Sequence, residues 1–242
     1  QMARGGRVGA EAVLHVPVVG RGGVPAQGVG AVVVNVTIVS PDQNGYATVY
    51  PKGAARPTAS NLNFVAGQTT PNLVVAKVGV DGSIAVFNKS GTVDVLVDVQ
   101  GWFPDDAVGF SSVVPARLAD TRVNCVLPCT IDGQMNRRGA LGPDGELHVP
   151  VVGRGGVPAS GVSAVVVNVT VVAPVLEGGQ SGFVTVFPKG SPRPTASNLN
   201  FVRGRTTPNL VVAKVGADGS ITIFNRFGTA DVLIDVQGWF PG

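Results

Sequence analysis

Short apolar runs, separated by turn residues, recur along the whole chain. In Ser220–Asn225 apolar and polar positions alternate, and Ile221 and Ile223 share one face. The run 164–172 is apolar on both faces, as expected for a central strand that is covered on both sides. Asp-Gly pairs at 81–82 and 218–219 lie between valine-rich runs and predict β-hairpin turns. The pattern therefore favours strands and turns over helices.

Applied to the C-terminal half, the pattern predicts a series of short strands separated by glycine, proline and aspartate. They are Glu146–Val152, Ala164–Val172, Phe183–Phe187, Asn198–Val202, Asn209–Val215, Ser220–Asn225 and Asp231–Val236. About seven short strands with regular turns are typical of a β-sandwich, and a small closed barrel is the alternative. The predicted fold class is all-β.

The chain contains an internal repeat. Four words occur in the same order in both halves, and they begin at Leu14 and Leu147, Pro57 and Pro194, Thr69 and Thr206, and Asp98 and Asp235. A repeat of this length predicts two copies of one domain.

The offset between the copies rises from 133 residues (147 minus 14) to 137 (235 minus 98), so the second copy has four additional residues. They fall within Pro174–Gly182, opposite Pro41–Gly45. Insertions collect in exposed loops, which predicts a turn between two strands here.

The predicted organisation is a first repeat at 1–104, a linker at 105–112 and a second repeat at 113–242, since 242 residues fit two domains of about 120 residues each. The first copy lacks a counterpart of 113–133. If Arg117–Arg122 forms a strand of the second copy, the first copy has an edge with unpaired backbone groups. Either the chain is an excerpt of a longer array, or a neighbouring chain supplies the segment.

Five ordered words carry a resemblance to a known family. They are Pro115–Arg122 (P-A-R-L-A-D-T-R), Gly156–Pro158, Ala164–Thr170, Ser197–Phe201 and Asp235–Phe240. The sequence resembles, over nearly its whole length, a repeat module of secreted and cell-surface proteins of actinobacteria. The resemblance implies an extracellular all-β accessory module, often in tandem or attached to cell-wall and polysaccharide enzymes, with no established activity. In that family the P-x-R-L-x-D-T-R word usually opens the domain, and the first copy lacks it.

Composition and charge exclude several classes of protein. With 44% hydrophobic and 14% charged residues, the chain is not disordered. The net charge is only +3 and Arg137-Arg138 is the one adjacent basic pair, so we expect no nucleic-acid partner. No apolar run approaches the roughly 20 residues of a membrane span.

The two cysteines, Cys125 and Cys129, are close in sequence, with Pro128 between them. They supply at most two metal ligands, neither histidine is near them, and their spacing is not that of a redox CxxC motif. We predict a disulfide, which implies an oxidising, extracellular compartment. Two free thiols are the alternative.

No residue pattern predicts catalysis, a metal site or a cofactor. His15 and His148 have no recognisable nucleophile context. Asp94 and Asp98, like their copies Asp231 and Asp235, lie about 13 Å apart along a strand, which is wide for the carboxylate pair of a glycosidase. Ca²⁺ binding has weak support, and we interpret these aspartates as outward-facing or turn-bonded.

Two binding chemistries are candidates. Amides and one indole in each copy are the groups that sugar sites use, and these residues are Asn61, Asn63 and Trp102, and Asn198, Asn200 and Trp239. Lys77 and Lys214, in otherwise apolar strands, are candidates for a spontaneous isopeptide bond to Asn35 and Asn168 or to Asp98 and Asp235. An exposed lysine on an edge strand explains the lysines more simply.

The sequence favours a non-enzymatic, extracellular structural repeat, part of a surface rod, fibre or coat, that assembles head-to-tail with itself or with other repeats of a longer chain. The alternative is a carbohydrate- or cell-wall-binding module that acts by avidity on a polysaccharide.

Overall fold

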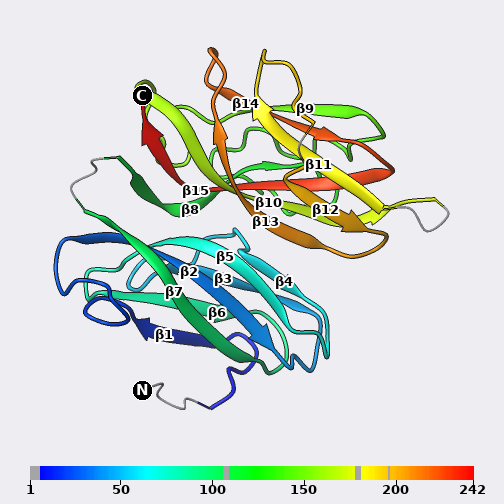
Figure 1. Ribbon diagram of the computed structural model, residues 1–242. Coiled ribbons are helices and arrows are strands. Elements are labelled where there is room, and N and C mark those ends of the chain that lie inside the picture. The colour runs from blue at the N-terminus through cyan, green and yellow to red at the C-terminus, as the bar shows by residue number, and fades with distance from the viewer. Residues whose placement is uncertain (1–5, 106–108, 178–180, 196) are drawn as a thin grey trace. The chain divides into compact units, whose positions relative to one another are not determined.

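The computed structural model describes residues 6–105, 109–177, 181–195 and 197–242 of the chain. These residues form fifteen strands and no helix, so the all-β prediction is confirmed (Figure 1). None of them belongs to a helix long and apolar enough to cross a membrane. The chain divides into two compact units, Gln1–Asp106 and Ala107–Gly242.

Unit 1 is a pair of antiparallel sheets. One sheet has the strand order β1-β6-β3-β4 and the other the order β5-β2-β7. The strands are β1 (Val13–Pro17), β2 (Val29–Val39), β3 (Gly45–Pro51), β4 (Leu62–Phe64), β5 (Thr70–Lys77), β6 (Ser83–Asn88) and β7 (Asp94–Pro104).

Unit 2 repeats this order and adds one strand. Its sheets have the orders β9-β14-β11-β12 and β13-β10-β15-β8. The strands are β8 (Ser111–Asp120), β9 (Gly145–Pro150), β10 (Val162–Val175), β11 (Ser181–Pro188), β12 (Leu199–Val202), β13 (Thr207–Lys214), β14 (Ser220–Asn225) and β15 (Thr229–Pro241). Each of the seven predicted strands is present. The additional strand is β8, which contains Arg117 and pairs with β15.

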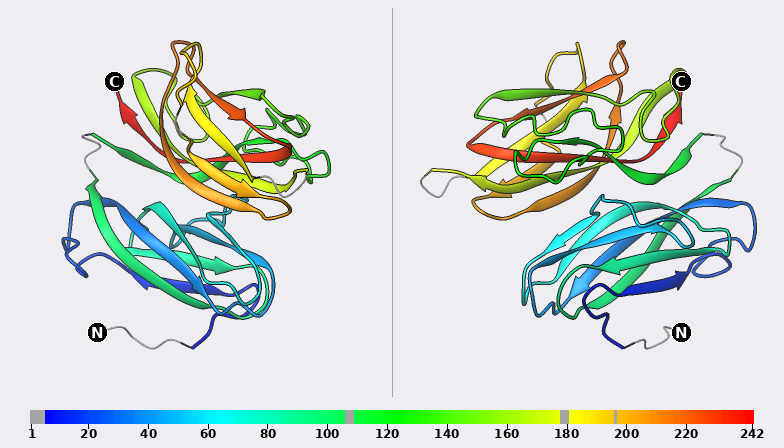
Figure 2. Two further views of the ribbon diagram at one scale, coloured as in Figure 1. Left: turned by 45° about the vertical axis from the view of Figure 1, so that its right-hand side comes forward. Right: turned by 180° about the vertical axis from the view of Figure 1, so that it is seen from behind.

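In each unit the two sheets pack face to face and do not close into a barrel (Figure 2), so the sandwich prediction is confirmed. In unit 2, Val165 and Val167 of β10 and Ile221 and Ile223 of β14 belong to one core, as the alternation in 220–225 predicts. The core of unit 1 is also rich in valine.

The two Asp-Gly turns are tight, but they are not β-hairpins. Gly82 and Gly219 have φ angles of +77° and +76°, a conformation that favours glycine. Each turn, however, joins strands of opposite sheets, β5 to β6 and β13 to β14. The hairpin prediction was therefore wrong, because an Asp-Gly pair specifies a reversal of the chain and not the sheet that the next strand joins.

The predicted linker was too long at its C-terminal end. Ser111 and Ser112 belong to β8, and Phe110 is buried, with its ring 5.1 Å from that of Phe240. Residues 106–108 of the predicted linker lie outside the described residues. The predicted insertion at Pro174–Gly182 covers the end of β10, which continues to Val175, and the start of β11 at Ser181. Residues 178–180 are outside the described residues.

Candidate functional site

An ion pair attaches β8 to its neighbour β15. Nε of Arg117 donates to Oδ1 of Asp235 at 2.8 Å, and Nη2 donates to Oδ2 at 3.1 Å. Both side chains are buried, and the two residues are directly opposite in the strand register. Two parallel bonds between a guanidinium and a carboxylate fix orientation as well as distance. The sequence predicted that Asp235 is outward-facing or turn-bonded. This prediction was wrong, because Asp235 is buried and holds a strand in place.

The end of β8 is attached by hydroxyl and carboxylate groups. Thr121 Oγ1 donates to Asp231 Oδ1 at 2.8 Å and accepts from the backbone N–H of Val232 at 2.8 Å. Asp120, which is fully buried, accepts hydrogen bonds from the backbone N–H, Nε and Nη2 of Arg122. The polar residues of the Arg-Leu-Ala-Asp-Thr-Arg word therefore act as links within the fold.

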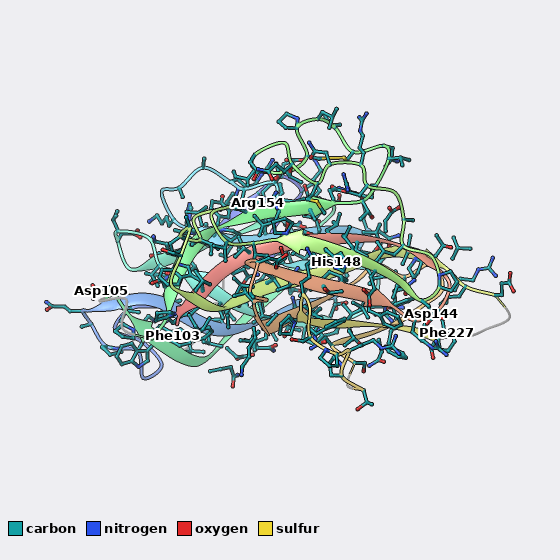
Figure 3. The ribbon with its side chains drawn as sticks, turned by 90° about the horizontal axis from the view of Figure 1, so that it is seen from above. Phe103, Asp105, Asp144, His148, Arg154 and Phe227 are labelled. Atoms are coloured by element: carbon teal, nitrogen blue, oxygen red, sulfur yellow. A yellow bond between two sulfur atoms is a disulfide. The ribbon has the colours of Figure 1, made fainter. Side chains whose placement is uncertain are left out.

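A second arginine, Arg154, which is labelled in Figure 3, joins β8 to the loop that follows it and to β9. Its Nη2 donates to the carbonyl of Leu118 at 2.8 Å, its Nη1 to the carbonyl of Pro150 at 2.8 Å, and its Nε to Asp132 Oδ2 at 2.6 Å. Hydrogen bonds from Arg154 and from the backbone N–H of Gln134 hold the pKa of Asp132 below its ordinary value. Arg154 is not among the site residues predicted from the sequence, and the Gly-Arg-Gly-Gly word present in both copies was the available signal.

The loop after β8 contains a disulfide between Cys125 and Cys129, with an S–S distance of 2.11 Å, so the predicted bond is confirmed. A carboxylate oxygen of Asp120 and the two sulfurs lie within 4.8 Å of one another, and oxygen and sulfur atoms of these residue types can bind metal ions. Sulfurs joined in a disulfide are not thiolates, and the thiolate is the form of cysteine that binds metals. Arg137, one of the adjacent basic pair, donates to the carbonyl of Cys125 from Nε and Nη2 at 3.1 and 2.7 Å.

Two of the candidate sugar-binding asparagines hold strands together instead. Asn61 and Asn198 accept, through Oδ1, from the backbone N–H groups of Val49 and Val186 at 2.6 and 2.7 Å. The other two have more freedom. Asn63 is half-buried, 3.5 Å from Ser60 Oγ, and Asn200 is exposed.

The candidate amides and indoles are on opposite sheets of each sandwich. Asn63 and Asn200 belong to β4 and β12, whereas Trp102 and Trp239 belong to β7 and β15. The two tryptophans also differ from each other. Trp102 is 41% exposed, while Trp239 packs partly buried against the core of unit 2. The strand pairing does not bring the predicted sugar-binding groups together.

Lys77 and Lys214 lie exposed at the ends of the edge strands β5 and β13. Lys77 is opposite Ala31, four positions along β2 from Asn35, and Lys214 is opposite Ala164, four positions from Asn168. Four strand positions are about 13 Å, too far for an amide bond between side chains. This placement fits the simpler interpretation of exposed edge lysines.

The histidines are on the exposed faces of β1 and β9. His148 Nδ1 is 3.1 Å from Thr222 Oγ1, and in the first copy His15 is opposite Ala85 instead of a threonine. The environments of the two histidines are therefore not equivalent.

No model of a known protein family matches the sequence, and no curated protein matches it either. The resemblance to an actinobacterial surface module stays a prediction from the sequence words.

Proposed function

We propose that this protein is a non-enzymatic structural module of an extracellular surface assembly. The observation that carries the proposal is the use of the polar residues of β15 and of the Arg-Leu-Ala-Asp-Thr-Arg word as internal links. Arg117 and Asp235, Thr121 and Asp231 join strands of unit 2 instead of facing a common cleft. Side chains that bond to one another inside the fold stabilise it, and they do not face a substrate.

Two further features support a durable extracellular building block. The disulfide between Cys125 and Cys129 is compatible with an oxidising compartment. Both units are antiparallel sandwiches with valine-rich cores, and a pair of related modules in one chain suits extension by repetition.

The test is the mass of the purified chain by light scattering over a wide range of concentrations. A structural module that assembles with itself gives a mass that rises above 24.6 kDa as the concentration increases. A mass of 24.6 kDa at every concentration would contradict self-assembly. The structural role would then depend on other repeats as partners.

A carbohydrate-binding module is the second candidate, favoured by the 41% exposure of Trp102. Sedimentation with insoluble cell-wall polysaccharide tests it. Under this alternative Trp102→Ala abolishes co-sedimentation, while Leu96→Ala, at an exposed apolar residue of the same strand, leaves it unchanged. Equal behaviour of the two variants would exclude the tryptophan as a sugar platform.

A further inference from the structure

The two units differ at one sheet edge. β15 pairs with β10 on one side and with β8 on the other, whereas its counterpart β7 pairs with β2 alone in the described part of the chain (Figure 1). The registers correspond, since Asp235 is opposite Asn168 and Asp98 is opposite Asn35. The backbone N–H and C=O groups on the second side of β7 therefore form the edge on which β8 would lie.

The core of unit 1 is open along the same edge. Val232, Ile234 and Val236 of β15 are fully buried, and Ala116 and Leu118 of β8 belong to the same core. Their counterparts in β7 only pack against the core of unit 1 as partly buried residues. These counterparts are Val95, Val97 and Val99. The apolar surface that β8 covers in unit 2 thus stays partly accessible in unit 1.

A pair of glycines shows the missing contact at atomic detail. A Cβ atom added to Gly238 would lie 2.3 Å from the ring of Phe110, so this ring packs on the bare backbone of β15. A Cβ atom added to the counterpart, Gly101, would have no atom within 4 Å. Unit 1 has retained the glycine while the space above it is open.

The polar partners are also retained. Asp235 and Arg154, which hold β8 in unit 2, correspond to Asp98 and Arg21 in unit 1, and both of these are exposed. At the outer end of the edge, Arg7 of unit 1 takes the place that Thr121 has in unit 2. There Arg7 Nε lies 3.5 Å from Asp94 Oδ2, whereas in unit 2 Thr121 bonds to the corresponding Asp231.

We infer that the free edge of β7 is a binding site for an extended strand with the chemistry of β8. Such a strand has an aromatic ring to pack on Gly101, small and branched apolar residues to close the core, and an arginine to pair with Asp98. Its footprint on β7 extends from Trp102 to Leu96, the counterparts of the β15 residues opposite Ser111 and Asp120.

The occupant is a strand of this type from outside units 1 and 2, and not the β8 of a second identical copy. The β8 strand in each chain already pairs with β15 through the buried Arg117–Asp235 ion pair, and its removal would leave Asp235 buried and uncompensated. The inference deepens the proposed function, on which it rests for its biological meaning, because it identifies how one module would join the next.

The experiment uses the full chain and a labelled synthetic peptide with the sequence of residues 109–121. We expect saturable binding by fluorescence anisotropy and slower hydrogen exchange at the amides of β7. Asp98→Arg is expected to weaken binding by about tenfold or more. A peptide in which aspartate replaces the arginine at the Arg117 position should recover binding to the Asp98→Arg chain.

A second, independent variant is Gly101→Ala, which adds a methyl group to open space in the free chain. We expect it to weaken binding of the peptide by about tenfold, and to have little effect on a peptide with alanine at the Phe110 position. This pair separates loss of the ring contact from a general disturbance of β7.

Three results would overturn the inference: no saturable binding up to about 1 mM peptide, binding that neither variant alters, or protection of β15 in place of β7. If the chain alone forms dimers and Asp98→Arg abolishes them, the edge binds a second copy of the chain. That result would also contradict a separate donor. Failure of the peptide to bind leaves the light-scattering result unaffected, so the inference and the proposed function can fail separately.

Discussion

Arg117 and Asp235, separated by 118 positions in the sequence, form a buried, bidentate ion pair that holds β8 at the edge of unit 2. The corresponding aspartate of unit 1, Asp98, is exposed on a strand without that neighbour. The same word, Asp-Val-Gln-Gly-Trp-Phe, is therefore part of an inner strand in one unit and of an edge strand in the other.

The first prediction concerns the ion pair. Arg117→Ala removes one partner and leaves Asp235 buried, so we expect the free energy of unfolding of unit 2 to fall by about 3–5 kcal/mol. Asp98→Ala is the matched control, with an expected change within about 0.5 kcal/mol. Urea unfolding that is monitored by hydrogen exchange at individual amides distinguishes the two units. Equal losses in both variants would contradict a specific role for the pair.

The two glycines provide a second prediction. Gly238→Ala forces a methyl group against the Phe110 ring and is expected to destabilise unit 2 by about 1–3 kcal/mol. Gly101→Ala meets open space and should leave the stability of unit 1 nearly unchanged. Thermal unfolding of the two variants checks this. A loss of similar size in both would show that the β8 contact is not the cause.

A third prediction concerns a buried asparagine that the sequence analysis did not single out. Asn225 Nδ2 contacts the carbonyls of Leu141, Gly142 and Gly228 at 3.1, 3.0 and 2.9 Å. Asn225→Asp replaces this donor with a carboxylate that faces carbonyl oxygens, while Asn225→Ala removes the three hydrogen bonds that the amide donates.

We expect a loss of about 3 kcal/mol for Asn225→Ala and a larger loss for Asn225→Asp at neutral pH, measured by urea unfolding. Asn200→Ala, at an exposed position, is the control and should be near neutral. If the aspartate variant were as stable as the wild type, the amide group would not be acting as the donor.

The fourth prediction is a pH dependence. Because Arg154 lowers the pKa of Asp132 in the folded state, the unfolded chain binds a proton at this carboxyl at higher pH than the folded chain does. The stabilisation is therefore present above the ordinary carboxyl pKa of about 4 and is lost as the pH falls through the lower folded-state pKa.

Asp132→Asn removes this titration, so the variant should be less stable than the wild type at neutral pH, with the difference shrinking in acid. Unfolding in urea between about pH 2 and pH 7 measures it. A difference that stays constant over the whole range would show that Asp132 acts without its charge.

Much of the fold could be predicted because the information is local. Alternation of apolar and polar residues depends on neighbours two positions away, so the strand at Ser220–Asn225 and its buried isoleucines follow from the sequence. The disulfide also follows, since four positions separate Cys125 from Cys129. The Asp-Gly pairs were predicted as β-hairpin turns, which was wrong because the sheet joined by the next strand depends on distant partners.

What only the tertiary structure decided is the environment of identical words. Trp102 and Trp239 have the same flanking residues, yet the first is 41% exposed and the second packs against a core. The residues next to each tryptophan in the sequence are the same. The difference in exposure therefore follows from β8, which lies beside β15 and has no counterpart beside β7 among the described residues. Pairing between distant strands determines burial, and burial determines whether a charge such as Asp235 links two strands or, like Asp98, faces water.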